Sequence, residues 1–150
     1  PYIFGRGGEE ALALAREGIP FRVLSGLTSG LSALAGAGIP ATMRGINKAV
    51  ILATGHAAGT DDDLDWAAIA RTGQPVVVYM GMANLPLISA SLLEGGLAAV
   101  IVAATTPQER IVVATLATIA EAAAAGGLTS PALIVVGGIV AMRAALAGEP

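Results

Sequence analysis

The first ten residues place an arginine between glycines, directly before a run that can form a helix. Arg6 stands between Gly5 and the glycine pair at positions 7 and 8, and Glu9 follows. Glycine allows backbone conformations and close approaches that a Cβ atom forbids, and a helix N-terminus offers unpaired N–H donors. A guanidinium group binds carboxylate or phosphate through parallel hydrogen bonds. The segment therefore fits an anion-binding loop, and it fits equally a glycine-rich turn with a solvated arginine and a first-turn carboxylate.

Hydroxyl residues and single polar residues follow several apolar runs farther along the chain. Thr28 and Ser29 come after the run 20–24, His56 comes after the run 49–54, and Met80 ends the run 75–80. Ligands of α/β proteins bind where strands end, so each of these is a candidate site residue. Each also has a structural interpretation: a helix N-cap for a hydroxyl, a structural role for the lone histidine, and core packing for the methionine.

The composition excludes several classes of partner and site. The 150 residues carry a net charge of −3 with 8 basic residues and no cysteine. Nucleic acid is not expected as a partner, because it calls for a basic patch, and the lack of cysteine excludes disulfides and thiol ligands. One histidine makes no metal site, and the aspartates between positions 61 and 65 lack the spacing and the glycine of a calcium loop. No metal is expected.

The hydrophobic content is high, at 55% of residues. No uninterrupted apolar run reaches the roughly 18 to 20 residues that a membrane helix needs. Strands covered on both faces read as continuous apolar runs, so the composition favours a buried sheet together with an oligomer surface. No membrane partner is expected, and the cytoplasm is the default location.

Apolar runs bounded by glycine and proline alternate with alanine-rich segments, which is typical of an α/β fold. The segment 40–48 is interpreted as a linker. We therefore expect the end of an N-terminal α/β domain over residues 1–42, followed by a C-terminal α/β domain with a mixed sheet over residues 43–150. Strands are predicted at 20–24, 49–54, 75–80, 98–103, 111–115 and 130–137, and helices at 11–17, 31–37, 64–70, 85–93, 117–125 and 140–147.

Several spaced motifs carry a resemblance to a known family. They are Ile-Phe-Gly-Arg-Gly-Gly-Glu-Glu at 3–10, Gly-Ile-Pro-x-Thr-x-Arg at 38–44, Leu-Asp-Trp at 64–66 with Tyr-Met-Gly at 79–81, and Ser-Pro-Ala-Leu-Ile-Val-Val-Gly at 130–137. In this combination the chain resembles the uroporphyrinogen-III C-methyltransferases of the tetrapyrrole methylase family. The resemblance begins just after the family's Gly-Gly-Asp, so we expect a C-terminal portion of a longer protein. The join at 94–97 is shorter than in the family, which indicates a shortened loop or, as we prefer, residues missing from the sequence.

The resemblance implies a tetrapyrrole methylase-like α/β fold and a reaction. Members transfer methyl groups in two successive steps from S-adenosylmethionine to uroporphyrinogen III, which gives precorrin-2 and S-adenosylhomocysteine and serves sirohaem, cobalamin and haem d1 biosynthesis. A homodimer is implied. The alternatives are another precorrin methylase, or a non-catalytic fragment kept for S-adenosylmethionine binding or dimerisation.

The motif matches also imply residue roles. Arg6 is the catalytic candidate and, with Glu9, Arg44 and His56, a substrate-binding one, because guanidinium groups suit the carboxylates of the macrocycle. Glu9 would either fix the arginine or face a pyrrole N–H. The implied cofactor-binding residues are Ile3, Thr28, Ser29, Met80 and Ala104. The last of these stands where relatives often have glycine.

Overall fold

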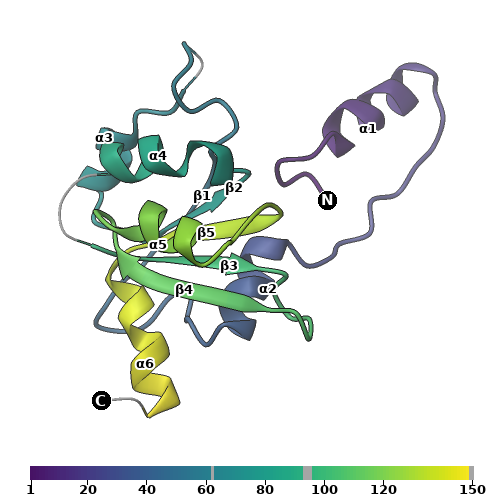
Figure 1. The fold of residues 1–150 in the computed structure, drawn as a ribbon. Helices are drawn as coiled ribbons and strands as arrows, with labels where there is room; N and C mark the ends of the chain where they lie inside the picture. The colour runs from purple at the N-terminus through teal and green to yellow at the C-terminus, as the bar shows by residue number, and fades with distance from the viewer. Residues whose placement is uncertain (62, 93–95, 149–150) are drawn as a thin grey trace.

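Five strands form one mixed sheet in the computed structural model, which describes residues 1–61, 63–92 and 96–148 (Figure 1). They are β1 (Ile51–Thr54), β2 (Val76–Tyr79), β3 (Leu97–Val102), β4 (Arg110–Thr115) and β5 (Ala132–Val136). Their order across the sheet is β1-β2-β5-β3-β4. β1 and β2 are parallel, whereas β5 is antiparallel to β2 and β3, and β4 is antiparallel to β3. The predicted strands from residue 49 onward are therefore confirmed, with small changes at their ends.

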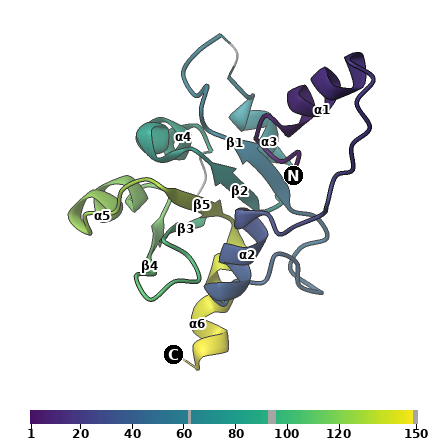
Figure 2. The ribbon, with the colours of Figure 1, turned by 90° about the vertical axis from the view of Figure 1, so that its right-hand side faces the viewer.

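Helices cover both faces of this sheet (Figure 2). One face carries α3 (Trp66–Arg71), the short η1 (Met82–Asn84), α4 (Leu85–Ser91) and α5 (Ile119–Ala125). The other face carries α2 (Ser29–Gly36), η2 (Gly138–Ala141) and α6 (Met142–Ala147). Successive residues of a strand point to opposite faces, so the valines of β2 alternate between the two cores. None of the helices described in the structure is long and apolar enough to cross a bilayer.

The N-terminal segment differs from the prediction. α1 (Gly7–Arg16) has no buried residue and stands apart from the sheet in Figure 1, and its first turn contains the glycine pair that was expected in a loop. The predicted strand at 20–24 is wrong: these residues are extended but unpaired, with Phe21 46% and Leu24 65% exposed. A strand needs a neighbour for its backbone hydrogen bonds, and none of the described strands pairs with this segment.

The segment 40–48, expected as a linker, is a turn fixed by one buried side chain. Asn47 accepts a hydrogen bond from the Met43 N–H at 3.0 Å and donates to the carbonyl oxygens of Ala41 and Ala49, both at 2.9 Å. A buried amide that makes all these bonds holds a single turn conformation. This turn leads directly into the N-terminal end of β1.

Two glycines let the ends of β1 and β2 approach closely. An ideal Cβ atom on Gly55 would lie 2.7 Å from the Gly81 Cα atom and 2.6 Å from the Ile88 Cδ1 atom. The Gly55 N–H also donates to the Tyr79 carbonyl oxygen at 2.8 Å, so the pairing continues past the end of β1. His56, which follows Gly55, and Met80, which precedes Gly81, therefore lie at the same edge of the sheet.

Some predicted features lie outside the described residues. The end of the predicted helix at Leu93 and the join over 93–95 are among them, as is Asp62. The helices predicted at 11–17, 31–37, 64–70 and 117–125 are present as α1, α2, α3 and α5, with ends shifted by a few residues. The predicted helix at 140–147 is divided between η2 and α6.

The Gly55 contact predicts a cost for any side chain at this position. Gly55→Ala should lower the free energy of unfolding by about 1 to 3 kcal/mol, because the added methyl group overlaps backbone and a buried side chain. Gly138→Ala is the matched control, since its Cβ atom would meet nothing within 4 Å, and it should change stability by less than about 0.5 kcal/mol. Urea denaturation of both variants measures the difference. Equal stability of the two would contradict the close approach of β1 and β2.

The loop after β1 predicts a pH-dependent signal. The Asp63 carboxylate accepts hydrogen bonds from the Gly59 N–H at 2.8 Å, the Trp66 indole N–H at 2.8 Å and the Leu64 N–H at 2.7 Å. The bond from Gly59, helped by the other two, holds the pKa of Asp63 below its ordinary value of 3.8. The lowered pKa means that the loop is stabilised above pH 3.8, and that this stabilisation is lost as the pH falls through the pKa of the folded state.

Trp66 is the only tryptophan in the sequence, so its indole N–H gives one identifiable NMR resonance. We expect this resonance to titrate with a midpoint below 3.8, and the step to vanish in Asp63→Asn. A midpoint at or above 3.8 in the folded protein would show that the three hydrogen bonds do not favour the carboxylate.

Candidate functional site

The parallel strands end at one edge of the sheet, and most of the candidate residues lie there. β1 and β2 are parallel, and β3 has the same direction because both β2 and β3 are antiparallel to β5. His56, Met80 and Ala104 follow the ends of these three strands. α2 begins at Ser29 against the same edge, where its first turn contacts Tyr79. Ligands of α/β proteins bind at this kind of edge.

Two adjoining cavities open at this edge. The strand-end cavity, of about 320 Å³, is bounded by Ser29, Tyr79, Met80, Ile101, Ala103, Ala104, Thr106, Pro131, Ala132 and Leu133. The turn cavity, of about 330 Å³, is bounded by Pro1, Ile3, Phe4, Leu27, Thr28, Ser29, Tyr79 and Met80. Ser29, Tyr79 and Met80 line both, so these three residues form the wall between them.

The structure brings together all five residues for which a cofactor role was predicted. Ile3 and Thr28 line the turn cavity, Ala104 lines the strand-end cavity, and Ser29 and Met80 line both. They come from parts of the chain that are up to about a hundred residues apart, and only the folded sheet places them side by side. Their binding role stays a prediction, now with a shared location.

The backbone around these cavities adopts left-handed conformations. Met80 has φ 52°, Ala103 has φ 49° and Phe4 has φ 49°. Such conformations cost a residue with a side chain roughly 1 to 3 kcal/mol and persist only where the surroundings impose them. At Ala103 the surroundings are a tight turn, since the Thr106 hydroxyl donates to the Ala103 carbonyl oxygen at 2.7 Å. The turns at Met80 and Ala103 redirect the chain directly after β2 and β3, and both residues line the strand-end cavity.

Arg6 and Glu9 form an ion pair beside the turn cavity. The Arg6 Nε–H donates to Glu9 Oε2 at 2.8 Å, and the two side chains are 84% and 66% exposed. Arg6 lies two residues after Phe4, whose ring centroid is 5.0 Å from that of Tyr79. The terminal nitrogens of the guanidinium group have no partner among the described residues, so they remain available to an anion.

His56 and Arg44 lie at opposite ends of β1. His56 is exposed, follows Gly55 and therefore lies near the Met80–Gly81 turn, and its N–H donates to Thr54 Oγ1 at 3.4 Å. Arg44 belongs to the turn that Asn47 fixes before the start of the strand. The structure thus places His56 at the edge that carries the cavities and Arg44 at the other. The substrate role of Arg44 stays a prediction that this arrangement does not favour.

The sequence interpretation missed Tyr79, Phe4 and Ala103 as residues of the site. Tyr79 was noted only as part of Tyr-Met-Gly, yet it lines both cavities and is 8% exposed. Strand alternation offered a signal, because Val77 and Tyr79 share a face and that face must meet a helix. Phe4 and Ala103 carried no such signal, since their place depends on left-handed turns between elements.

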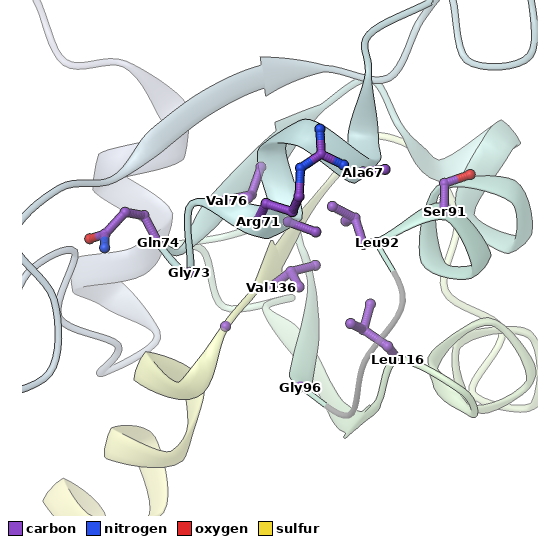
Figure 3. A pocket seen from close by; sticks show the side chains of 12 residues that line it. Ala67, Arg71, Gly73, Gln74, Val76, Ser91, Leu92, Gly96, Leu116 and Val136 are labelled. Carbon is purple, nitrogen blue, oxygen red and sulfur yellow. The ribbon is translucent and has the colours of Figure 1, made fainter.

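A larger cavity, of about 440 Å³, lies at the opposite edge, where β1, β2 and β3 begin (Figure 3). Figure 3 shows the side chains of Leu92, Leu116 and Val136 around it, with Arg71 of α3 as its charged residue. None of the predicted site residues lines it. Its lining includes Leu92 and Gly96, the last and first described residues on either side of a gap in the description, and we assign no site there.

Among the residues that the structure describes, no group of three or more histidine, aspartate or glutamate side chains is placed to hold a metal ion. The functional groups of the residues at the cavity edge include the hydroxyls of Thr28, Ser29 and Tyr79 and the thioether of Met80.

Comparison with known proteins gives the chain its relatives. A uroporphyrinogen-III C-methyltransferase of Pseudomonas aeruginosa is 52% identical over 100 residues, which cover 65% of this chain and 40% of that protein. One from Sinorhizobium is 43% identical over 153 residues, covering 97% and 55%. This chain thus spans about half the length of the curated relatives that it matches.

A solved structure and a family model agree with these relatives. The uroporphyrin-III C-methyltransferase of Thermus thermophilus, solved in complex with S-adenosylhomocysteine, superposes with a TM-score of 0.77 at 34% identity, over 94% of this chain and 63% of that one. The predicted tetrapyrrole methylase-like α/β fold is thereby confirmed. The family model "Tetrapyrrole (Corrin/Porphyrin) Methylases" matches residues 1–120. The chain belongs to the tetrapyrrole methylase family.

Proposed function

We propose that the protein is an S-adenosylmethionine-dependent C-methyltransferase that converts uroporphyrinogen III to precorrin-2 by two successive methyl transfers. The observation that carries this proposal is the convergence of Ile3, Thr28, Ser29, Met80 and Ala104 on two adjoining cavities. The names of the relatives support the same reaction, and the bound S-adenosylhomocysteine of the Thermus thermophilus protein supports the same cofactor.

The cavities suit the two chemical halves of this cofactor. The strand-end cavity has apolar walls from Met80, Ile101 and Leu133, which suit the faces of an adenine ring. The turn cavity adds the Thr28 and Ser29 hydroxyls, which can hydrogen-bond to polar groups. Alanines at 103 and 104 leave backbone accessible at the strand-end cavity. When bound, S-adenosylmethionine supplies an electrophilic methyl group.

The chain's own residues would then hold and align the macrocycle. Arg6 would pair with a substrate carboxylate through its free terminal nitrogens, while Glu9 fixes the guanidinium group from the other side. His56, which follows the end of β1, would donate a further hydrogen bond to the substrate. A pyrrole carbon is already an electron-rich nucleophile, so alignment with the methyl group is the main demand on the protein. The substrate role predicted for Arg44 is not part of this proposal, because Arg44 lies before the start of β1, away from the cavities.

The remaining predictions concern organisation. We propose a division into residues 1–42 and 43–150, a homodimer and a cytoplasmic location, with a role in sirohaem or cobalamin biosynthesis. The two segments share a core, since Leu34 of α2 and Ile39 are both 1% exposed against the sheet. A boundary at residue 42 would therefore divide the sequence into two segments that still pack against each other.

Two measurements on the intact protein test the proposed function. Isothermal titration with S-adenosylhomocysteine should show a stoichiometric site, and incubation with uroporphyrinogen III and S-adenosylmethionine should yield precorrin-2. Binding without this product would leave another precorrin methylase or a non-catalytic fragment that binds S-adenosylmethionine. Absence of binding would leave a non-catalytic fragment and would end the proposal.

The exposed ion pair predicts a separation of catalysis from cofactor binding. Arg6→Leu should lower kcat/KM for uroporphyrinogen III by roughly 100-fold or more, because the guanidinium partner of a substrate carboxylate is removed. The Kd for S-adenosylhomocysteine should stay within about twofold, since an exposed ion pair contributes little to the fold. Arg16→Leu, at the other end of α1, is the matched control and should retain activity. Loss of cofactor binding in Arg6→Leu would contradict the assigned role.

The shared wall of the cavities predicts the opposite pattern for Met80. Met80→Ala should raise the Kd for S-adenosylhomocysteine roughly tenfold, because an apolar contact with the ligand is lost. The same change at Met43, a half-exposed methionine in the turn before β1, should leave the Kd unchanged. Titration calorimetry of both variants makes the comparison, and equal affinities would assign Met80 to packing alone.

A further inference from the structure

Tyr79 lines both cavities and contacts residues from two other parts of the chain. It is the last residue of β2, it precedes Met80, and its ring lies 5.0 Å from that of Phe4 at an angle of 54°. Its hydroxyl oxygen lies 2.7 Å from Thr28 Oγ1 and 3.0 Å from the Gly30 nitrogen. One side chain therefore connects the N-terminal segment, the first turn of α2 and the end of β2.

The Tyr79 hydroxyl does what an N-cap side chain usually does. Thr28 is the N-cap residue of α2, but its own side chain makes no capping hydrogen bond. The Gly30 N–H, one of the free donors at the start of the helix, donates instead to Tyr79. The Thr28 side chain is thus released from the helix, and it lines the turn cavity.

The direction of the second hydrogen bond follows from counting protons. The Tyr79 oxygen already accepts the Gly30 N–H, and its own proton needs an acceptor because the residue is 8% exposed. Thr28 Oγ1 is the acceptor within reach among the described residues. The distance between the two oxygens allows either hydroxyl to donate, and the burial of the phenol favours Tyr79 as the donor. With that direction, the Thr28 proton is left for an acceptor in the turn cavity.

The hydrogen bond between Tyr79 and the first turn of α2 requires a residue without a side chain at position 30. An ideal Cβ atom on Gly30 would lie 2.2 Å from the Tyr79 oxygen and 2.6 Å from the ring carbon that carries it. No side chain fits there without displacing the phenol. The sequence therefore combines a tyrosine at the end of β2 with a glycine in the first turn of α2, and the glycine leaves the space that the phenol occupies.

We propose that Tyr79 is a positioning residue for the methyl donor: its hydroxyl fixes the first turn of α2 and orients the Thr28 hydroxyl as a hydrogen-bond donor toward the bound ligand. This inference rests on the proposed function, because it takes the ligand of the turn cavity to be S-adenosylmethionine or its product. It assigns Tyr79 no contact with the reacting methyl group.

Titration of the intact protein with S-adenosylhomocysteine tests the inference. Tyr79→Phe keeps the ring and its contact with Phe4, and it should raise the Kd roughly fivefold to tenfold. Thr28→Val should have a similar effect, whereas Thr28→Ser, which keeps the hydroxyl, should bind with the affinity of the wild type. The Tyr79→Phe/Thr28→Val double variant should bind no more weakly than the weaker single variant, because both changes break the same chain of hydrogen bonds. Tyr2→Phe removes the other tyrosine hydroxyl, which is on a half-exposed ring, and should leave the Kd unchanged.

The possible results separate this inference from the function on which it rests. A wild-type protein that does not bind S-adenosylhomocysteine overturns both. A wild type that binds, with Tyr79→Phe of equal affinity, overturns the inference alone, even if the melting temperature falls, since that result describes a structural role only. Additive effects in the double variant also overturn it. If Tyr79→Phe does not fold, the Kd values of Thr28→Val and Thr28→Ser for S-adenosylhomocysteine are compared instead. Equal affinities of these two variants overturn the proposal.

Discussion

The central strands of this protein are buried on both faces, and the position of the candidate site depends on that constraint. Val76, Val77 and Val78 of β2 are each at most 2% exposed, although they point alternately to opposite sides of the sheet. A sheet of this kind is stable only when helices cover both faces. The second face is covered by α2, through Ala33 and Leu34, together with η2 and α6. This packing places the beginning of α2 at the edge where β2 ends.

Small residues determine how closely the segments at that edge can converge. Gly55 and Gly81 allow β1 and β2 to touch, and Gly30 accommodates the Tyr79 phenol. At the other end of α2, an ideal Cβ atom on Gly36 would lie 2.8 Å from Thr105 Cγ2, so the β3–β4 turn rests on the helix. The cavities are thus bounded by segments whose backbones approach one another where side chains are absent.

Local sequence patterns predicted the sheet well and failed where pairing or distant contacts decide. The runs at 75–80, 98–103 and 130–137 form strands because their apolar residues have two helical layers to pack against. The run at 20–24 is also mostly apolar, although it contains Arg22, but it has no described neighbour, so its strand propensity has no effect. The resemblance to a family found the cofactor candidates by residue matching. It did not find Tyr79, whose partners Thr28 and Gly30 are 51 and 49 residues away.

The contrast between the two kinds of candidate residue has a physical explanation. The predicted cofactor residues form preformed walls, held by Tyr79 and by turns such as that at Ala103, which reduces the entropy lost on binding. Arg6 is instead paired with Glu9 in an ion pair that is mostly exposed. An exposed pair is worth little, so under the proposed function a substrate carboxylate would bind the terminal nitrogens of Arg6 without a large desolvation cost. A buried arginine would have to be desolvated and paired in advance, and the incoming anion would then compete with a strong partner. Under the proposed function, a rigid apolar pocket for the methyl donor beside a solvated guanidinium group is therefore the arrangement that lets a polyanionic macrocycle enter and leave.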